Sequence, residues 1–259
     1  MSGPLDLDML RGLQHRTSSE TMLLDQIEQH LERHDGYLPF SGGKDSLVVL
    51  HLALQVDPNV PVAFFNSGAE FPQTLDYFDE LNEAWDLNLH VYPARIPLLN
   101  YLDATGAWAY DRELVSTDFT LRDNLIEEPA ARAHYDHGAG ELWGVRAAES
   151  HSRTMVYRNA RARGSAPGQI LRQDGTVAFC PIWDWSTDQV WSYIRHHQLP
   201  VNPVYDILRR LGAPEHHQRV GPMIDGDHLT SGRATWLKLG WPAEFEHLAT
   251  VLPRLREFA

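Results

Sequence analysis

Cysteine is almost missing from this sequence, because Cys180 is the only one among 259 residues. A single cysteine excludes a disulfide within the chain, and it excludes a metal or iron–sulfur site built from three or four cysteines of one chain. Cys180 lies in an apolar run just before a proline, which is typical of a small buried hydrophobic residue. We therefore expect no iron–sulfur cluster.

Long apolar runs are missing as well. No segment reaches the roughly eighteen consecutive apolar residues of a membrane-spanning helix. Residues 1–20 also lack the basic start and the apolar core of a secretory signal. These absences predict a cytoplasmic protein with no membrane span.

Basic residues are scarce: 22 Lys and Arg stand against 35 Asp and Glu, which gives a net charge of −13. Affinity for nucleic-acid backbones comes mainly from clustered Lys and Arg, so strong direct nucleic-acid binding is not expected. One local basic cluster, Arg158, Arg161 and Arg163, is most simply a solvated helix face. A role with DNA would need a partner protein or this local patch.

What the sequence does contain is an alternation of strand-like and helix-like segments. Apolar runs typical of buried strands lie at residues 36–40, 60–66, 88–92, 141–144 and 177–181. Helical patterns lie at residues 18–33, 47–56, 74–85, 117–137 and 188–196. This alternation predicts an α/β fold with a doubly wound, mostly parallel sheet.

The same patterns suggest how the chain is divided. We expect a helical N-terminal segment over residues 1–34, a nucleotide-binding domain over residues 35–198, and a C-terminal extension over residues 199–259 that packs on the core. The segment 161–175 is rich in Gly and Arg and is expected to be a mobile excursion, either a hairpin or a lid. Pro39 should shorten the first strand, because proline removes one donor from the ladder.

A glycine-rich loop joins the first predicted strand to the next predicted helix. It reads Ser41, Gly42, Gly43, Lys44, Asp45 and Ser46. Its two glycines allow the backbone to approach a phosphate closely, and a helix start offers free N–H groups at the positive end of the helix dipole. Its two serines add hydroxyl donors, Lys44 can neutralise phosphate charge, and Asp45 can orient the loop or help to hold Mg²⁺. The loop therefore suits a leaving pyrophosphate, and its spacing is not that of a Walker A loop.

Three later motifs join this loop in an ordered set. They are Phe64 to Thr74, Trp143 to Arg153, and Cys180 to Trp191. Together the four motifs resemble those of the PP-loop ATP pyrophosphatases, and within them the phosphoadenylylsulfate (PAPS) reductase branch, over roughly residues 35–225. The resemblance implies an adenine nucleotide α-hydrolase-like fold that binds ATP together with Mg²⁺.

In an open parallel sheet, ligands lie at the carboxyl ends of the strands, which is where these motifs fall. Asn66 and Ser67 are expected to hydrogen-bond the ribose or the adenine, and Arg146 and Arg153 to stabilise charge on the α-phosphate or on an anionic substrate. The candidate catalytic residues are Lys44, Asp45, Arg146 and Arg153. The candidate nucleotide-binding residues are Ser41, Gly42, Gly43, Lys44, Asp45, Ser46, Asn66, Ser67, Gly68 and Gly144, and Asp45 is also the candidate metal ligand. Asp184 and Trp185 are more often a helix cap and a core aromatic.

The resemblance breaks at the thiol. PAPS reductases act through a cysteine in a C-terminal tail, and residues 199–259 contain none. We therefore expect the adenylating reaction, in which an acceptor oxygen attacks the α-phosphorus of ATP and pyrophosphate leaves. The stretches Gly144 to Ser150 and Pro200 to Asp206 are most similar to the ATP pyrophosphatase component of DNA phosphorothioation. That similarity implies an acceptor activated for sulfur incorporation, with a cysteine desulfurase and DNA-handling proteins as partners.

Three alternatives stay open: a sulfate adenylyltransferase-type subunit, a nucleotide-binding subunit that depends on a partner for catalysis, and a PAPS reductase, which the missing tail cysteine disfavours. The sequence also leaves a homo-oligomer open. Its histidine pairs are more often surface residues than metal ligands. The pairs are His196 with His197 and His216 with His217. The same holds for His228, which lies near Asp225 and Asp227. Arg219, beside Gly221, is placed to reach phosphates from the C-terminal extension.

Overall fold

The computed structural model describes the backbone of residues 7–106, 108–224 and 232–259, and the side chains from Glu20 onward within those ranges. The strands are β1 (Gly36–Pro39), β2 (Val62–Asn66), β3 (Leu89–Pro93), β4 (Gly140–Leu142), β5 (Gln169–Leu171) and β6 (Val177–Phe179). The α-helices are α1 (Leu7–Arg33), α2 (Lys44–Val56), α3 (Pro72–Trp85), α4 (Leu98–Thr105), α5 (Glu128–His137), α6 (His151–Ala162), α7 (Thr187–His196), α8 (Val204–Arg210), α9 (Arg233–Gly240) and α10 (Pro242–Val251). Short π and 3₁₀ turns lie at Asp123–Glu127, Ala147–Glu149, Glu215–His217 and Pro253–Phe258.

The six strands form one sheet in the order β3-β2-β1-β4-β6-β5. All neighbouring strands are parallel except β5, which pairs antiparallel with β6 at the edge. Because β1 lies between β2 and β4, the chain turns to opposite sides of β1 as the sheet grows. The carboxyl end of β1 is therefore the switch point where open α/β sheets bind their ligands.

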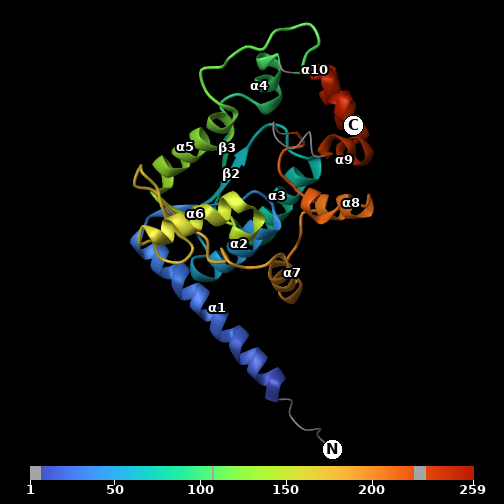
Figure 1. Ribbon diagram of the computed structural model, residues 1–259. Helices are drawn as coiled ribbons and strands as arrows, with labels where there is room; N and C mark the ends of the chain where they lie inside the picture. The colour runs from blue at the N-terminus through green and yellow to red at the C-terminus, as the bar shows by residue number, and fades with distance from the viewer. Residues whose placement is uncertain (1–6, 107, 225–231) are drawn as a thin grey trace, which may run out of the picture.

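Helices cover both faces of the sheet (Figure 1). On one face α5 contacts β1, β2 and β3, and its Ala133 packs with Tyr37, Ala63 and Tyr92. On the other face α1, α2, α3 and α7 bury the main apolar core with strand residues such as Leu38. Apolar side chains alternate between the two faces of a strand, so strands buried on both sides read as continuous apolar runs. The predicted doubly wound α/β fold is confirmed.

Pro39 limits the pairing of β1 on one side only. The neighbouring N–H groups of Leu38 and Phe40 donate to β2 and the residue before it, at Pro61 and Ala63. Successive backbone N–H groups point to opposite neighbours, so the missing donor of Pro39 faces β4. The β1–β4 ladder accordingly ends at Tyr37, and the predicted shortening occurs against that strand.

Two segments show in detail how the structure compares with the sequence patterns. The helix expected at residues 117–137 begins only after Thr120, whose N–H and hydroxyl both donate to Asp123 and end the preceding loop. Of the two forms expected for the segment 161–175, the structure shows the hairpin: the segment contains β5, which pairs with β6 and completes the edge of the sheet.

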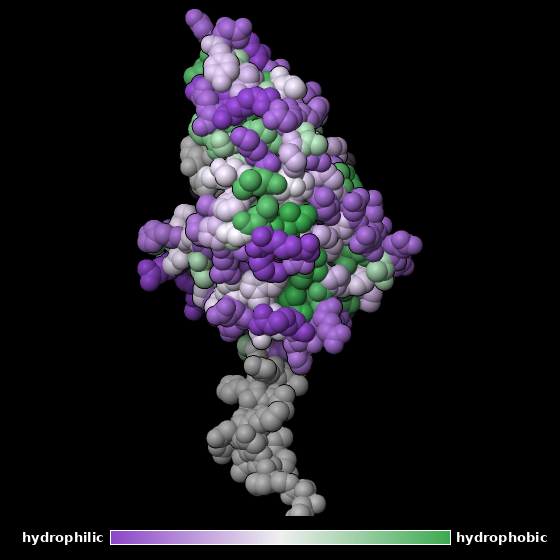
Figure 2. Space-filling model, turned by 90° about the vertical axis from the view of Figure 1, so that its right-hand side faces the viewer, coloured by the Kyte–Doolittle hydropathy of each residue, from purple (hydrophilic) through white to green (hydrophobic). Residues whose placement is uncertain are grey.

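The helices after α7 build a second apolar cluster. Side chains of α8, α9 and α10 pack there with Leu98 and Leu102 of α4 and with Phe71. On the side of the molecule where these helices lie, apolar groups are surrounded by hydrophilic ones (Figure 2). The division of the chain at residues 34 and 198 remains our proposal. The structure shows that the two parts separated at residue 198 share an apolar cluster, because α4 packs there with α8, α9 and α10.

A hollow of about 770 Å³ opens beside α7 and α8, lined by residues that include Trp191, Leu199 and Arg209. Its lining includes no residue of the glycine loop. Among the helices of the described ranges, none has the length and apolar character that crossing a membrane requires.

Candidate functional site

The glycine loop leaves the carboxyl end of β1 and enters α2, as the sequence predicts. Gly42 has φ +72°, a left-handed conformation that glycine adopts without strain. The Ser46 hydroxyl donates to the Gly43 carbonyl oxygen at 3.0 Å, and its oxygen lies 3.1 Å from the Ser41 hydroxyl. The two serines therefore brace the loop, and their role as phosphate donors stays a prediction.

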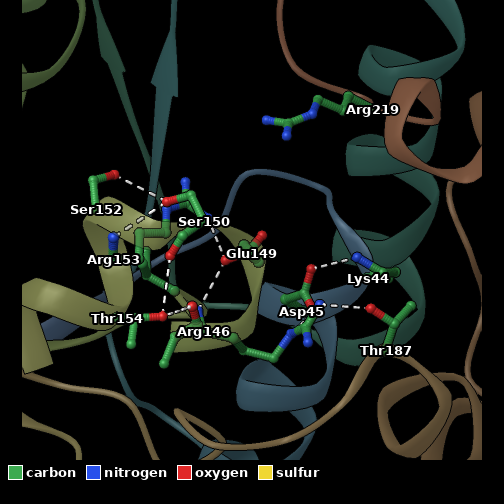
Figure 3. A network of polar contacts seen from close by, with 12 residues as sticks. Lys44, Asp45, Arg146, Glu149, Ser150, Ser152, Arg153, Thr154, Thr187 and Arg219 are labelled. Carbon is green, nitrogen blue, oxygen red and sulfur yellow. Dashed lines mark hydrogen bonds and ion pairs between the residues drawn. The ribbon is translucent and has the colours of Figure 1, made fainter.

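Asp45 lies between two cations. Its carboxylate accepts from Lys44 Nζ at 2.7 Å and from Arg146 Nε at 2.6 Å (Figure 3). Asp45 is 9% exposed, so these contacts are poorly screened by water. A carboxylate neutralised by two cations suits the loop-orienting role better than the role of a magnesium ligand.

Arg146 was expected to contact a phosphate or an anionic substrate, but it is only 1% exposed. Besides Asp45, its guanidinium donates to the Trp185 carbonyl oxygen at 2.8 Å and to the Thr187 hydroxyl at 3.3 Å. Arg146 therefore fixes the loop to the start of α7. Its planar guanidinium has enough N–H donors to make all three hydrogen bonds at once. This geometry makes Arg146 a positioning residue for the loop, and its contact with a nucleotide stays a prediction.

Arg153 belongs to the neighbouring turn. Its guanidinium pairs with Glu149, whose carboxylate also accepts the Arg146 backbone N–H at 2.9 Å. Ser150 caps α6 by accepting the Arg153 N–H at 3.2 Å. Figure 3 shows Arg153 and Ser150 on one side of the loop and Arg219 reaching in from the other. Arg219 is exposed, and its contact with a phosphate stays a prediction.

Gly144 lies where a side chain would not fit. A Cβ placed on it would stand 2.5 Å from the Ser46 backbone nitrogen and 2.8 Å from the Asp45 carbonyl carbon. The strand end of β4 and the first turn of α2 can therefore meet only at a glycine. This close contact gives Gly144 a structural reason to be near the loop, and its predicted nucleotide contact is untested.

The third predicted group follows β2. Asn66 Oδ1 accepts the Gly68 N–H at 2.8 Å, which holds a turn with Gly68 at φ +79°. The Ser67 hydroxyl donates to Glu70 at 2.6 Å, and both residues are buried. Burial raises the pKa of Glu70, whereas the hydrogen bonds from Ser67 oppose that rise. Asn66 and Ser67 are therefore both engaged within this turn, and the predicted contacts of Asn66, Ser67 and Gly68 with a ribose or an adenine stay untested.

Tyr205 and Asn202 contact the glycine loop, and the site predictions did not include them. The Tyr205 hydroxyl accepts the Lys44 backbone N–H at 3.0 Å. A Cβ on Gly42 would lie 3.3 Å from Asn202 Nδ2, so the two side chains line the loop from the C-terminal extension. The one signal available was the stretch Pro200 to Asp206, which carried part of the family resemblance.

Cys180 is completely buried, and burial raises the pKa of its thiol. Cys180 thus lies in the core as expected, and its thiol is not accessible to solvent in this structure. Within the described ranges, no three His, Cys, Asp or Glu side chains gather to hold a metal ion. His228, Asp225 and Asp227 lie outside the described residues.

Residues 36–216 match the family described as the phosphoadenosine phosphosulfate reductase domain. The chain belongs to this family. It is 30% identical over 180 residues to the phosphoadenosine 5'-phosphosulfate reductase of Xylella fastidiosa strain M12, covering 69% of this chain and 70% of that protein. It is 28% identical to the reductase of the same name from Vibrio cholerae serotype O1 strain O395, covering 72% of this chain and 75% of that protein.

The fold is similar to that of the PAPS reductase from Candida auris, solved as a phosphate complex. The two share 21% identity with a TM-score of 0.53, over 76% of this chain and 87% of that one. The resemblance drawn from the four motifs is therefore confirmed at the level of the PAPS reductase family. The named relatives in this family are enzymes. These similarities do not extend to DNA phosphorothioation, and they favour the reductase alternative over it.

Proposed function

We propose that this member of the PAPS reductase family binds ATP with its polyphosphate on the loop 41–46 and cleaves it between the α and β phosphates. The observation that carries the proposal is the loop itself. It stands at the switch point of the sheet, at the start of α2, with Lys44 on it and with Asp45 held by the buried Arg146. Loop N–H groups, hydroxyls and one lysine are the donors that stabilise a leaving pyrophosphate.

The reaction balances without any redox partner. An acceptor oxygen forms a bond to the α-phosphorus as the bond from that phosphorus to the α–β bridging oxygen breaks. Pyrophosphate leaves with the electron pair, and an AMP ester of the acceptor remains. With water as the acceptor, the displaced proton passes to solvent and AMP is the product.

Sulfonucleotide reduction is the second candidate, and the family match and the named relatives favour it. Such a reduction needs a thiolate to attack sulfur. Cys180, the single cysteine of the sequence, is completely buried. A reductase built on this chain would therefore take its attacking thiol from another protein or from a small thiol.

One experiment with two arms separates the candidates. The first arm measures pyrophosphate and AMP released from ATP and Mg²⁺, alone and with sulfate or DNA as acceptor. The second measures sulfite released from PAPS in the presence of a reduced thiol protein. We expect pyrophosphate from the wild-type protein, its loss in Lys44→Ala, and normal release from the control Lys238→Ala, which removes the exposed lysine of α9. Sulfite without pyrophosphate would establish the reductase instead.

The finer proposals depend on the acceptor. Pyrophosphate release stimulated by DNA together with a cysteine desulfurase would support phosphorothioation, whereas stimulation by sulfate would support a sulfate adenylyltransferase-type subunit. Calorimetric ATP binding with no turnover under any of these conditions would support a nucleotide-binding subunit.

A further inference from the structure

Tyr205 is held rigidly beneath the glycine loop. It lies in the first turn of α8, is 4% exposed, and packs edge to face on Trp191 with ring centroids 5.4 Å apart. Just before it, Asn202 donates to the Thr74 hydroxyl at 3.0 Å and accepts the Val204 N–H at 3.0 Å. These contacts bind the start of α8 to α3, so the Tyr205 hydroxyl has a fixed position.

That position is on the backbone of the loop. The hydroxyl accepts the Lys44 N–H at 3.0 Å, and its oxygen lies 3.6 Å from where a Cβ on Gly43 would stand. The Lys44 N–H is one of the first N–H groups of α2, which have no partner within their own helix. The tyrosine oxygen therefore occupies the positive end of this helix, where an anion would bind.

The proton of the hydroxyl is still available. A phenol carries one proton and can accept a hydrogen bond at the same time. The bond from Lys44 uses an acceptor lone pair, and in the described part of the chain no acceptor takes the Tyr205 proton. Burial raises the pKa of Tyr205, so the group keeps that proton. Because a buried donor without an acceptor is costly, a phosphate oxygen on the loop would satisfy it.

We propose that Tyr205 is a phosphate-binding residue that donates its hydroxyl proton to a β- or γ-phosphate oxygen while it accepts the Lys44 N–H. The inference rests on the proposed function only in requiring that the loop holds a polyphosphate. Because Tyr205 comes from the segment after residue 198, this contact makes the C-terminal extension part of the nucleotide site.

The test compares Tyr205→Phe with the matched control Tyr77→Phe. Tyr77 is equally buried and donates its hydroxyl to the Pro200 carbonyl oxygen at 3.0 Å, so the control also loses one buried hydroxyl. Calorimetry measures the binding of pyrophosphate, ATP and AMP to each protein. A hydrogen bond to a charged group implies about tenfold to a hundredfold weaker binding of pyrophosphate and ATP by Tyr205→Phe. AMP binding by this variant, and all binding by the control, should stay at the wild-type level.

The outcomes are separable. If Tyr205→Phe binds pyrophosphate as well as the wild type or better, the tyrosine only caps the Lys44 N–H, which then binds phosphate itself, and the inference is overturned. Equal weakening of AMP and pyrophosphate would indicate a distorted loop and would also overturn it. If the wild-type protein binds neither ATP nor pyrophosphate, the proposed function fails first and the inference falls with it.

Discussion

The buried contact between Asp45 and Arg146 offers the sharpest test of how the loop is held. Asp45→Asn keeps the shape of the side chain and removes its negative charge. Arg146, 1% exposed, then remains buried without a counter-charge, while its bonds to Trp185 and Thr187 persist. Breaking a buried ion pair by removing one partner costs about 3–5 kcal/mol.

Two features reduce that cost here. The Asp45 side chain is 13% exposed, and an asparagine oxygen can still accept the Arg146 Nε–H. We therefore expect a loss of about 2–3 kcal/mol in the free energy of unfolding. For a protein of this size, each kcal/mol lowers the unfolding temperature by about 2–4 °C, so a decrease of about 5–10 °C is expected.

The control is Asp206→Asn, which makes the same chemical change at a surface ion pair. Asp206 bonds Arg209 at 2.5 Å, and both side chains are more than half exposed, at 59% and 54%. Exposed pairs contribute about 0–1 kcal/mol, so this variant should unfold within about 3 °C of the wild type. Differential scanning calorimetry of the three proteins measures the effect. Asp45→Asn unfolding no earlier than Asp206→Asn would refute the reasoning that the buried pair holds the loop.

Three further predictions concern other parts of the structure. Gly144→Ala should weaken ATP binding at least about tenfold, because its Cβ would meet the Ser46 backbone nitrogen at 2.5 Å, whereas Gly221→Ala, with no atom within 4 Å of its Cβ, should bind normally. Cys180 should resist iodoacetamide in the folded protein and react only after denaturation, because it is fully buried; rapid labelling would contradict this. Burial lowers the pKa of His30 to about 4, so its neutral form stabilises the fold and stability should fall as pH drops from about 6.5 toward 4. Calorimetry at pH 7.5 and pH 5 should show a smaller decrease for His30→Leu, and an equal decrease would show that other groups cause it.

The fold and the loop were predictable because their signals are local. The strand β1, the two glycines of the loop and the helix α2 follow one another directly in the sequence. Strands that are buried on both faces are recognised as continuous apolar runs. The order of the strands was predictable only in part. Crossovers between parallel strands are right-handed, but this rule does not decide on which side of β1 the next strand lies. The edge strand β5 lay in a segment whose composition favours loops.

The contacts that complete the site were not predictable, because they join distant residues. Arg146 and Asp45 are 101 positions apart, and Tyr205 and Lys44 are 161 apart. From the sequence, an arginine near a glycine loop suggests a residue that binds phosphate. Only the folded chain shows that the Arg146 guanidinium donates instead to Asp45, Trp185 and Thr187. No periodicity in the sequence brings a tyrosine of the C-terminal extension to the first N–H of α2.

The distant contacts also explain why the glycine loop contains an acid. Arg146 must stay buried to join the loop to α7, and Asp45 supplies the charge that makes this burial tolerable. Asp45 also bonds Lys44, so the loop region presents a smaller positive charge than its two cations alone would give. A phosphate bound as we propose would then depend largely on neutral donors, such as the loop N–H groups and the Tyr205 hydroxyl. In the proposed cleavage of ATP, neutral donors would bind the departing pyrophosphate less tightly than a second free cation, which would favour turnover over product retention.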